Sequence, residues 1–193
     1  MLTTTAAARE RLGLPDTKDD AWLTTAIGWA TGIFEKICNR QFGRIAGALQ
    51  EFDACDQTVL LRRYPVESIS LFSLRVGLVW LPESGVLYDY DGDSGVLHLY
   101  SPLGSEGKRA RVMYTGGYVL PADVFVEDQG QTQLPTELQA ACLEQIAYWY
   151  QRRDQLGLGS ISTAGGSVSQ SGTMRLLPVV EETLMPYRRI RMI

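Results

Sequence analysis

Hydrophobic residues recur at helical spacing in two long stretches of the chain. Residues 19–39 and 136–154 both place apolar side chains three and four positions apart, which is the spacing of an amphipathic helix that buries one face. Residues 5–12 predict a short first helix, and the segment that begins at Pro178 predicts a short last helix. These four segments define a small helical core.

The helix expected over residues 19–39 contains Gly28 and Gly32 within its periodic pattern. A glycine in a helix interior costs about 1 kcal/mol relative to alanine. We expect another helix to pack close to these two positions, because close packing would explain the cost.

The end of the helix expected over residues 136–154 mixes aromatic and basic side chains, from Tyr148 to Arg153. Such a mixture could stack on nucleic-acid bases beside phosphate contacts. At helical spacing, however, Trp149 and Tyr150 belong to the apolar stripe, whereas Gln145 lies largely off it. Packing against the core therefore explains this signal better than nucleic-acid binding.

Between residues 43 and 118, the pattern changes to short apolar runs separated by clusters of Gly, Pro, Asp and Ser. Such runs predict β-strands joined by turns. The expected strands are residues 46–53, 57–63, 66–76, 85–90, 95–100 and 108–114. A meandering antiparallel sheet is the simplest arrangement, so we expect an α+β fold with this sheet inserted between the second and third helices.

The helices and the sheet divide the chain into segments. Residues 1–42 hold the N-terminal helices of the core, residues 43–118 the sheet, and residues 134–156 the third helix of the core. Residues 119–133 lie between the sheet and the third helix and are expected to form an extra loop.

The C-terminal part of the chain changes character twice. Residues 157–177 are rich in Gly, Ser and Thr, a composition typical of a flexible arm, and residues 178–193 are basic. The glycines expected to give the arm its flexibility are Gly157, Gly159, Gly165, Gly166 and Gly172.

Charge is distributed unevenly along the chain. The net charge is −4, but residues 152–193 hold six arginines against three carboxylates, which gives this end +3 and leaves −7 for the rest. A basic end on an acidic body can dock on nucleic acid or on an acidic protein surface, or remain solvated without a partner.

Composition limits the cellular setting. The chain has 193 residues, 45% of them hydrophobic, which is enough for one good core. No run of about 18 apolar residues is present and the N-terminus lacks the apolar centre of a signal peptide, so we expect a soluble protein made in a cytoplasm, with no membrane partner. Cys38, Cys55 and Cys142 are far apart and odd in number, which favours buried thiols over disulfides or a thiolate metal site.

Two features could carry chemistry but are better explained structurally. Residues 89–93 alternate carboxylates as a calcium loop begins, yet Ser94 and Tyr100 stand where such a loop needs Gly and Glu, so a hairpin turn is favoured. The single histidine, His98, lies in an expected strand, without a nucleophile motif beside it. We therefore expect no catalytic residue, no metal site and no cofactor.

Taken in order, the motifs of this chain resemble those of the head-to-tail connector proteins of tailed bacteriophages. These are also called adaptor or head-completion proteins, and the resemblance is to the longer form with a sheet between its helices. The motifs that carry it are residues 34–42, 60–69, 87–89, 94–97 and 112–118, then Leu134-Pro135-x-x-Leu138-x-x-Ala141, residues 150–153 and residues 184–189. One departure from the family pattern is the extra segment, residues 119–133.

The resemblance implies a structural protein of the virion neck, made in the bacterial host. Proteins of this family form a ring, usually of twelve copies, under the capsid portal, where they extend the DNA channel and join the head to the tail. The implied partners are the portal protein, the next neck or tail component, further copies of the chain, and non-specifically the DNA in the channel.

The candidate interface with the portal or a neighbouring subunit is the basic C-terminal segment. A chain end that carries a flexible arm is suited to reach a partner. The candidate interface residues are Leu176, Leu177, Pro178, Leu184, Pro186, Tyr187, Arg188, Arg189 and Arg191.

Three other functions fit the sequence less well. Within the structural class, a tail-completion or tail-terminator ring protein is the closest competitor. A DNA-binding factor associated with packaging would use the arginine-rich end, and its binding would weaken steeply with salt. An enzymatic function is the least supported, because the sequence has one histidine and no nucleophile motif from which a catalytic mechanism could be built.

Overall fold

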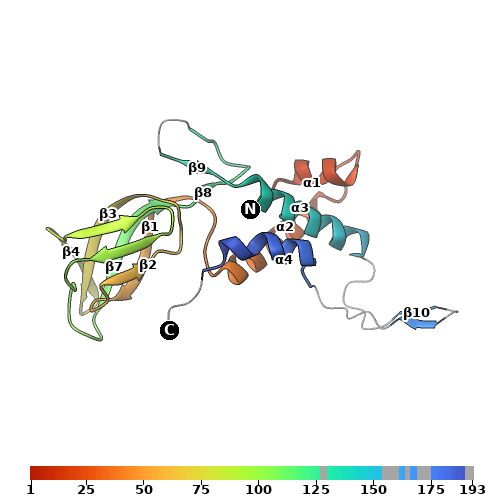
Figure 1. The fold of residues 1–193 in the computed structure, drawn as a ribbon. Coiled ribbons are helices and arrows are strands. Elements are labelled where there is room, and N and C mark those ends of the chain that lie inside the picture. Colours follow the sequence, from red (N-terminus) through yellow and green to blue (C-terminus); the bar gives the residue numbers. More distant parts are fainter. Residues whose placement is uncertain (127–129, 154–160, 164–165, 169–174, 190–193) are drawn as a thin grey trace. The chain divides into compact units, whose positions relative to one another are not determined.

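The computed structural model describes residues 1–126, 130–153, 161–163, 166–168 and 175–189. The chain divides into two compact units. The helical unit contains residues 1–38 and 135–193, and the sheet unit contains residues 39–134. The predicted α+β fold, with antiparallel sheets between the second and third helices, is confirmed (Figure 1).

The described part of the helical unit contains four helices and one 3-10 turn, in addition to a short strand pair given below. The helices and the turn are α1 (Thr5–Leu12), α2 (Asp20–Cys38), α3 (Thr136–Gln151), α4 (Pro178–Leu184) and η2 (Met185–Tyr187). Both ends of α1 are capped: Thr4 accepts a hydrogen bond from the backbone N–H of Ala7 at 3.2 Å, and Gly13 adopts a left-handed conformation (φ 66°) after the last turn. The observed bounds of these helices agree closely with the predicted ones.

The apolar stripes of the helices meet in one core. The buried side chains of α2 and α3 follow the predicted spacing, and α4 adds Val180 and Leu184. One prediction about α3 is wrong, because Gln145 is completely buried. Its amide can lie inside the core because the backbone of residues 175–177 satisfies it.

The expectation that a helix packs at Gly28 and Gly32 is also wrong. A Cβ atom built at either glycine meets no heavy atom of the described chain within 4 Å, so both glycines face outward from α2. Trp29, between them, is about half exposed. The intrachain packing of the described helices therefore does not explain why glycine stands at these positions.

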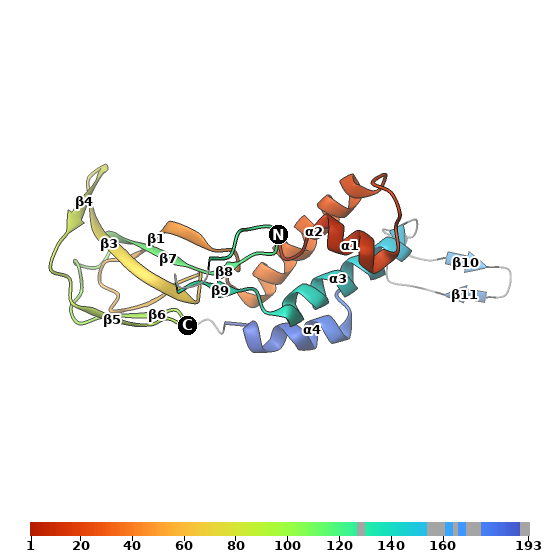
Figure 2. The same cartoon turned by 90° about the horizontal axis from the view of Figure 1, so that it is seen from above.

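Two antiparallel sheets make up most of the sheet unit (Figure 2). The larger sheet has the order β1 (Ile45–Asp53), β7 (Arg109–Gly116), β3 (Val66–Val76) and β4 (Val79–Glu83). The smaller sheet has the order β2 (Thr58–Leu60), β6 (Val96–Leu99) and β5 (Tyr88–Asp91). Side chains from both sheets form one hydrophobic core, which includes Phe52, Leu61, Phe72, Leu97 and Val112.

The sheet differs from the predicted meander in two ways. Strand β7 pairs with both β1 and β3, so strands far apart in sequence are neighbours. The prediction also missed β4. Hydrophobic alternation indicates which face of a strand is buried but does not indicate which strand lies beside it.

Two shorter strand pairs complete the described chain. β8 (Tyr118–Val119) pairs in parallel with β9 (Thr132–Gln133), which lies within the expected extra segment. β10 (Ile161–Thr163) pairs with β11 (Gly166–Val168) in antiparallel fashion.

Close backbone contacts at the end of β7 require glycine at positions 116 and 117. A Cβ atom at Gly116 would lie 2.7 Å from the carbonyl oxygen of Arg63, and one at Gly117 would lie 2.6 Å from that of Gly43. Gly117 also has a positive φ of 103°. Only glycine fits both positions without moving the neighbouring backbone.

Candidate assembly surfaces

The C-terminal segment, predicted as a docking arm, forms a helix of the core from residue 178. Helix α4 packs against α3 and α2. Leu176 and Leu184, two of the candidate interface residues, are buried together with Val180. These three side chains are four residues apart, the spacing of one helix face, and this signal in the sequence could have identified the buried side.

Polar contacts also hold the segment to the helical unit. The side-chain oxygen of Gln145 accepts a hydrogen bond from the backbone N–H of Leu177 at 2.8 Å, and its amide nitrogen donates to the carbonyl of Arg175 at 3.3 Å. The backbone N–H of Arg189 donates to the carbonyl of Cys38 at 2.9 Å.

Tyr187 is a further anchor of the segment. Its hydroxyl donates to the carboxylate of Glu137 at 2.5 Å, and this hydrogen bond lowers the pKa of Glu137 below its ordinary value. The ring is half-buried, so this candidate interface residue already has a partner in its own chain.

The outward side of the segment carries an apolar patch. Val179 is 58% exposed and Met185 is 63% exposed, and Pro178 and Pro186 are exposed as well. Positions 178 and 185, and likewise 179 and 186, are seven residues apart and therefore lie about two helical turns apart on one side. We call these four residues the C-terminal patch. The sequence analysis missed Val179 and Met185.

The other candidate C-terminal residues are placed as follows. Arg188 is exposed, and Leu177 and Arg189 are half-buried. Gly166 is the first residue of β11 and pairs with Thr163. The candidates that lie outside the described residues are Arg191, Gly157, Gly159, Gly165 and Gly172.

The two arginines that follow α3 contact side chains of their own unit. Arg152 donates to the hydroxyl of Tyr148 at 2.8 Å and lies over its ring. Arg153 is 3.2 Å from a carboxylate oxygen of Asp19 and lies over the ring of Tyr150. These contacts agree with packing as the explanation of the sequence signal.

Asp19 is the centre of this small network. The hydroxyl of Tyr150 donates a hydrogen bond to it, and Arg153 adds a positive charge. Both lower the pKa of Asp19, the hydrogen bond more strongly, while partial desolvation acts in the opposite direction. The network links the residue that precedes α2 to the end of α3.

Residues 89–91 end β5, and residues 92–95 form the hairpin turn that leads into β6, as expected. Asp91 accepts hydrogen bonds from the backbone N–H of Asp93 at 3.0 Å and from the hydroxyl of Ser94 at 2.6 Å. His98 lies exposed on β6, with Nδ1 3.2 Å from the hydroxyl of Thr58. Within the described residues, no group of three or more His, Cys, Asp or Glu side chains could hold a metal ion.

The cysteines follow the prediction only in part. Cys38 and Cys142 are buried, and burial raises the pKa of the Cys142 thiol to about 12. Cys55 is exposed, contrary to expectation, because it lies in the turn between β1 and β2 beside the carboxylate of Asp53.

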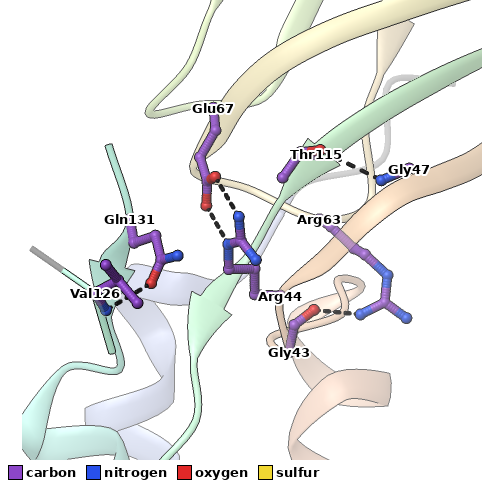
Figure 3. Close-up of polar contacts among 8 residues, drawn as sticks. All are labelled: Gly43, Arg44, Gly47, Arg63, Glu67, Thr115, Val126 and Gln131. Carbon is purple, nitrogen blue, oxygen red and sulfur yellow. Dashed lines mark hydrogen bonds and ion pairs between the residues drawn. The ribbon is translucent and has the colours of Figure 1, made fainter. Parts of the chain in front are cut away.

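Charged groups stabilise the end of the sheet unit where β1 begins (Figure 3). Arg44 donates two hydrogen bonds to the carboxylate of Glu67, at 2.7 and 2.8 Å, and Arg63 donates to the carbonyl of Gly43. In the neighbouring segment, the amide oxygen of Gln131 accepts from the backbone N–H of Val126 at 3.1 Å.

An open pocket of about 340 Å³ lies along β1, and polar side chains form most of its lining. Three arginines, Arg62, Arg63 and Arg109, line it together with Glu51. Arg109 lies 3.9 Å from Glu51, at the limit of an ion pair. This mixture of charges suits contact with polar groups of a protein surface.

None of the helices in the described part of the chain is both long enough and apolar enough to cross a membrane.

A sheet unit is inserted into a helical unit, and exposed apolar side chains lie on both units, a feature typical of surfaces that contact other molecules. A family model described as "Head completion protein" matches residues 1–190, so the chain belongs to the head completion protein family. Membership confirms the predicted resemblance and the expectation of a structural, non-enzymatic protein of a phage-like particle.

Two solved structures share the fold. A chain in the "Neck of empty GTA particle computed with C6 symmetry" aligns with a TM-score of 0.63 and 17% identity, over 100% of this chain and 92% of that chain. A chain in the "Virion of native gene transfer agent (GTA) particle" aligns with a TM-score of 0.59 and 16% identity, over the same shares. A comparison with curated proteins found no match.

Proposed function

We propose that this protein forms a ring under the capsid portal of a phage-like particle, in the neck, where it extends the DNA channel and joins the head to the tail. One observation carries the proposal: the family model matches residues 1–190 of the chain. The location is supported by a fold similarity: the whole chain aligns with a chain from the neck of a gene transfer agent particle.

The ring would contain twelve copies. The solved neck was computed with sixfold symmetry, and twelve is a multiple of six. A ring of identical subunits requires a heterologous contact, in which two different surfaces of neighbouring copies meet and the rotation closes.

The partners would be the portal protein on one side and the next neck or tail component on the other. The ring would also contact the DNA in the channel non-specifically. The C-terminal patch is the part of the candidate interface best suited to the portal or to a neighbouring subunit. Its apolar side chains are exposed, whereas Leu176 and Leu184 hold the helix in place. Arg188, exposed beyond the patch, adds a charge that can pair with an acidic surface.

Rebinding to purified heads tests the proposal. Heads from a strain that lacks the protein are mixed with the purified chain, sedimented, and tested for their ability to join tails. We expect the chain to sediment with the heads and to restore joining. A chain that binds neither heads nor tails would contradict the proposed function.

A substitution pair tests the role of the C-terminal patch. Deletion of residues 175–193 would expose the core, so the double variant Val179→Asp with Met185→Asp is the better probe. We expect it to remain folded and to lose head binding, because a charge would be buried at the contact. Val124→Asp, at a position that is 84% exposed in the other unit, is the matched control and should bind normally.

A further inference from the structure

The outward side of α2 carries an exposed tryptophan and an exposed lysine on a flat part of the helix. Trp29 is 48% exposed, and Lys36 follows it seven residues later on the same side. Between and beside them lie Gly28 and Gly32, where an added Cβ atom would meet no heavy atom within 4 Å. We call these four residues the α2 face.

Lys36 differs from the basic side chains around it, because it has no carboxylate partner within the described residues. The neighbouring Glu35 is half-buried and has an interaction of its own within the chain. The other basic side chains on α1, before α2 and at the end of α3 all contact a partner: Arg9 contacts Asp20, Arg11 contacts Glu144, Lys18 contacts Asp16, Arg152 contacts Tyr148, and Arg153 contacts Asp19.

A carboxylate stands at the centre of the C-terminal patch. Glu182 is exposed and lies three or four residues from each of the four patch residues, so their side chains surround it on α4. Arg188 lies outside this group, after the 3-10 turn. A carboxylate that is covered by an apolar contact loses its water, which is costly unless a cation pairs with it. The surface that covers this patch is therefore expected to be apolar and to carry a basic side chain.

The α2 face and the C-terminal patch lie on different sides of the helical unit. Helix α3 is central, since it packs against α1, α2 and α4. Figure 2 shows α2 and α4 on opposite sides of α3. Both surfaces are exposed, so each points away from this central helix. Two unlike surfaces on different sides of one unit are what a heterologous contact between copies requires.

We propose that the C-terminal patch of one copy packs on the α2 face of the next copy, with Glu182 paired to Lys36. The inference rests on the proposed function, because it assigns a lateral contact of the proposed ring. The spacing of the residues agrees with it. Along a helix, Val179 lies about 4.5 Å before Glu182, and Gly32 lies about 6 Å before Lys36. Pairing the two charges therefore brings Val179 over Gly32, where no side chain blocks the approach.

This contact also accounts for the glycines of α2. Glycine is unfavourable inside a helix, and the packing of the described chain gives no reason for it at positions 28 and 32. A helix of the next copy can approach closely only where side chains are absent. The exposed ring of Trp29 then has an apolar surface to contact.

Charge reversal tests the contact. Lys36→Glu and Glu182→Lys each bring two like charges together, so each should lower the amount of chain assembled into rings on heads by about tenfold or more. The double variant restores the pair in reversed order and should assemble nearly as well as the unaltered chain. Lys18→Glu, at the other exposed lysine of the helical unit, is the matched control and should assemble normally. Thermal unfolding of the single variants should be unchanged, because both side chains are exposed.

Two results of the charge reversal would overturn the inference while the proposed function would stand. Assembly of Lys36→Glu equal to that of Lys18→Glu would show that the α2 face lies outside the contact. Loss of assembly in Glu182→Lys without recovery in the double variant would show that the patch meets another partner, such as the portal. Heads that bind none of the unaltered chain would remove both the inference and the proposed function.

Alanine at position 32 provides a second, independent measurement. Gly32→Ala should raise the thermal stability of the isolated chain, because the position is open and lies within α2. The same substitution should lower ring assembly on heads, since the added methyl group occupies the place of Val179 from the next copy. A purely structural role of the glycine would not give these opposite effects. Ring assembly of Gly32→Ala equal to that of the unaltered chain would contradict the contact.

Discussion

The side-chain oxygen of Gln145, inside the helical core, accepts a hydrogen bond from the backbone N–H of Leu177 at 2.8 Å. Leu177 immediately precedes α4, so this bond fixes the point at which the C-terminal helix begins. The same amide donates to the carbonyl of Arg175. The C-terminal helix is thus anchored at its start, and only its outward side remains available to a partner.

Replacing Gln145 by leucine should destabilise the helical unit by about 1–3 kcal/mol, because the backbone groups that Gln145 satisfies would lose their partner. The free energy of unfolding from denaturant titration checks this value. Hydrogen exchange should also show faster exchange in α4. Gln151→Leu, on the exposed side of α3, should change stability by less than about 0.5 kcal/mol. Equal effects of the two substitutions would contradict the anchoring role.

Asp19 should titrate below its ordinary pKa of 3.8, chiefly because the hydroxyl of Tyr150 donates to it. A lowered pKa means that this carboxylate stabilises the fold above about pH 3.8, and that the contribution is lost as the pH falls through the folded-state pKa. NMR titration of the chain and of Tyr150→Phe checks this. We expect the substitution to raise the pKa of Asp19, and an unchanged value would argue against the hydrogen bond.

Gly28→Ala and Gly32→Ala should each stabilise the chain by about 0.5–1 kcal/mol, because both positions are open and lie within α2. Gly116→Ala should destabilise it, since a Cβ atom there would lie 2.7 Å from a carbonyl oxygen. Thermal unfolding of the three variants measures the contrast. If the α2 substitutions lowered stability, the outward placement of these glycines would be wrong.

Arg40 is buried in the sheet unit, with its guanidinium group over the ring of Tyr64 and close to the rings of Phe42 and Tyr118. It also donates a hydrogen bond to the carbonyl of Tyr64. Arg40→Lys should cost about 2 kcal/mol, because lysine keeps the charge but loses the planar stacking.

The exposed Arg62→Lys is the control for this substitution and should be nearly neutral. Denaturant unfolding of both variants provides the comparison. A neutral Arg40→Lys would show that the aromatic contacts add little to stability.

The sequence predicted an element best where the spacing of its apolar residues depends on that element alone. The helix expected over residues 19–39 is α2, Asp20–Cys38, because helical spacing of apolar residues reports directly on one buried face. The order of the strands could not be obtained in this way, since β7 pairs with strands more than 30 residues away. Pairing across such distances depends on the whole core and leaves no local signal.

The burial and exposure of individual side chains were predicted less well, for two physical reasons. Gln145 is polar and was expected to lie off the buried stripe of its helix. It is buried because backbone groups of a distant segment form hydrogen bonds with its amide. Val76 ends a predicted strand, whereas Leu78 and Val79 lie outside the predicted strands, and only the extension of the β3–β4 hairpin beyond the pairing with β7 shows that all three are exposed. Exposure of apolar side chains depends on tertiary packing, which alternation alone does not encode.

A cryo-electron microscopy reconstruction of the neck, computed without imposed symmetry from particles that carry this protein, tests the central claim most directly. We predict a closed ring of twelve copies beneath the portal, into which both units of the chain fit. Particles from a strain that lacks the protein should show no such ring. Density for the chain elsewhere in the particle, or an identical neck in its absence, would contradict the proposed function.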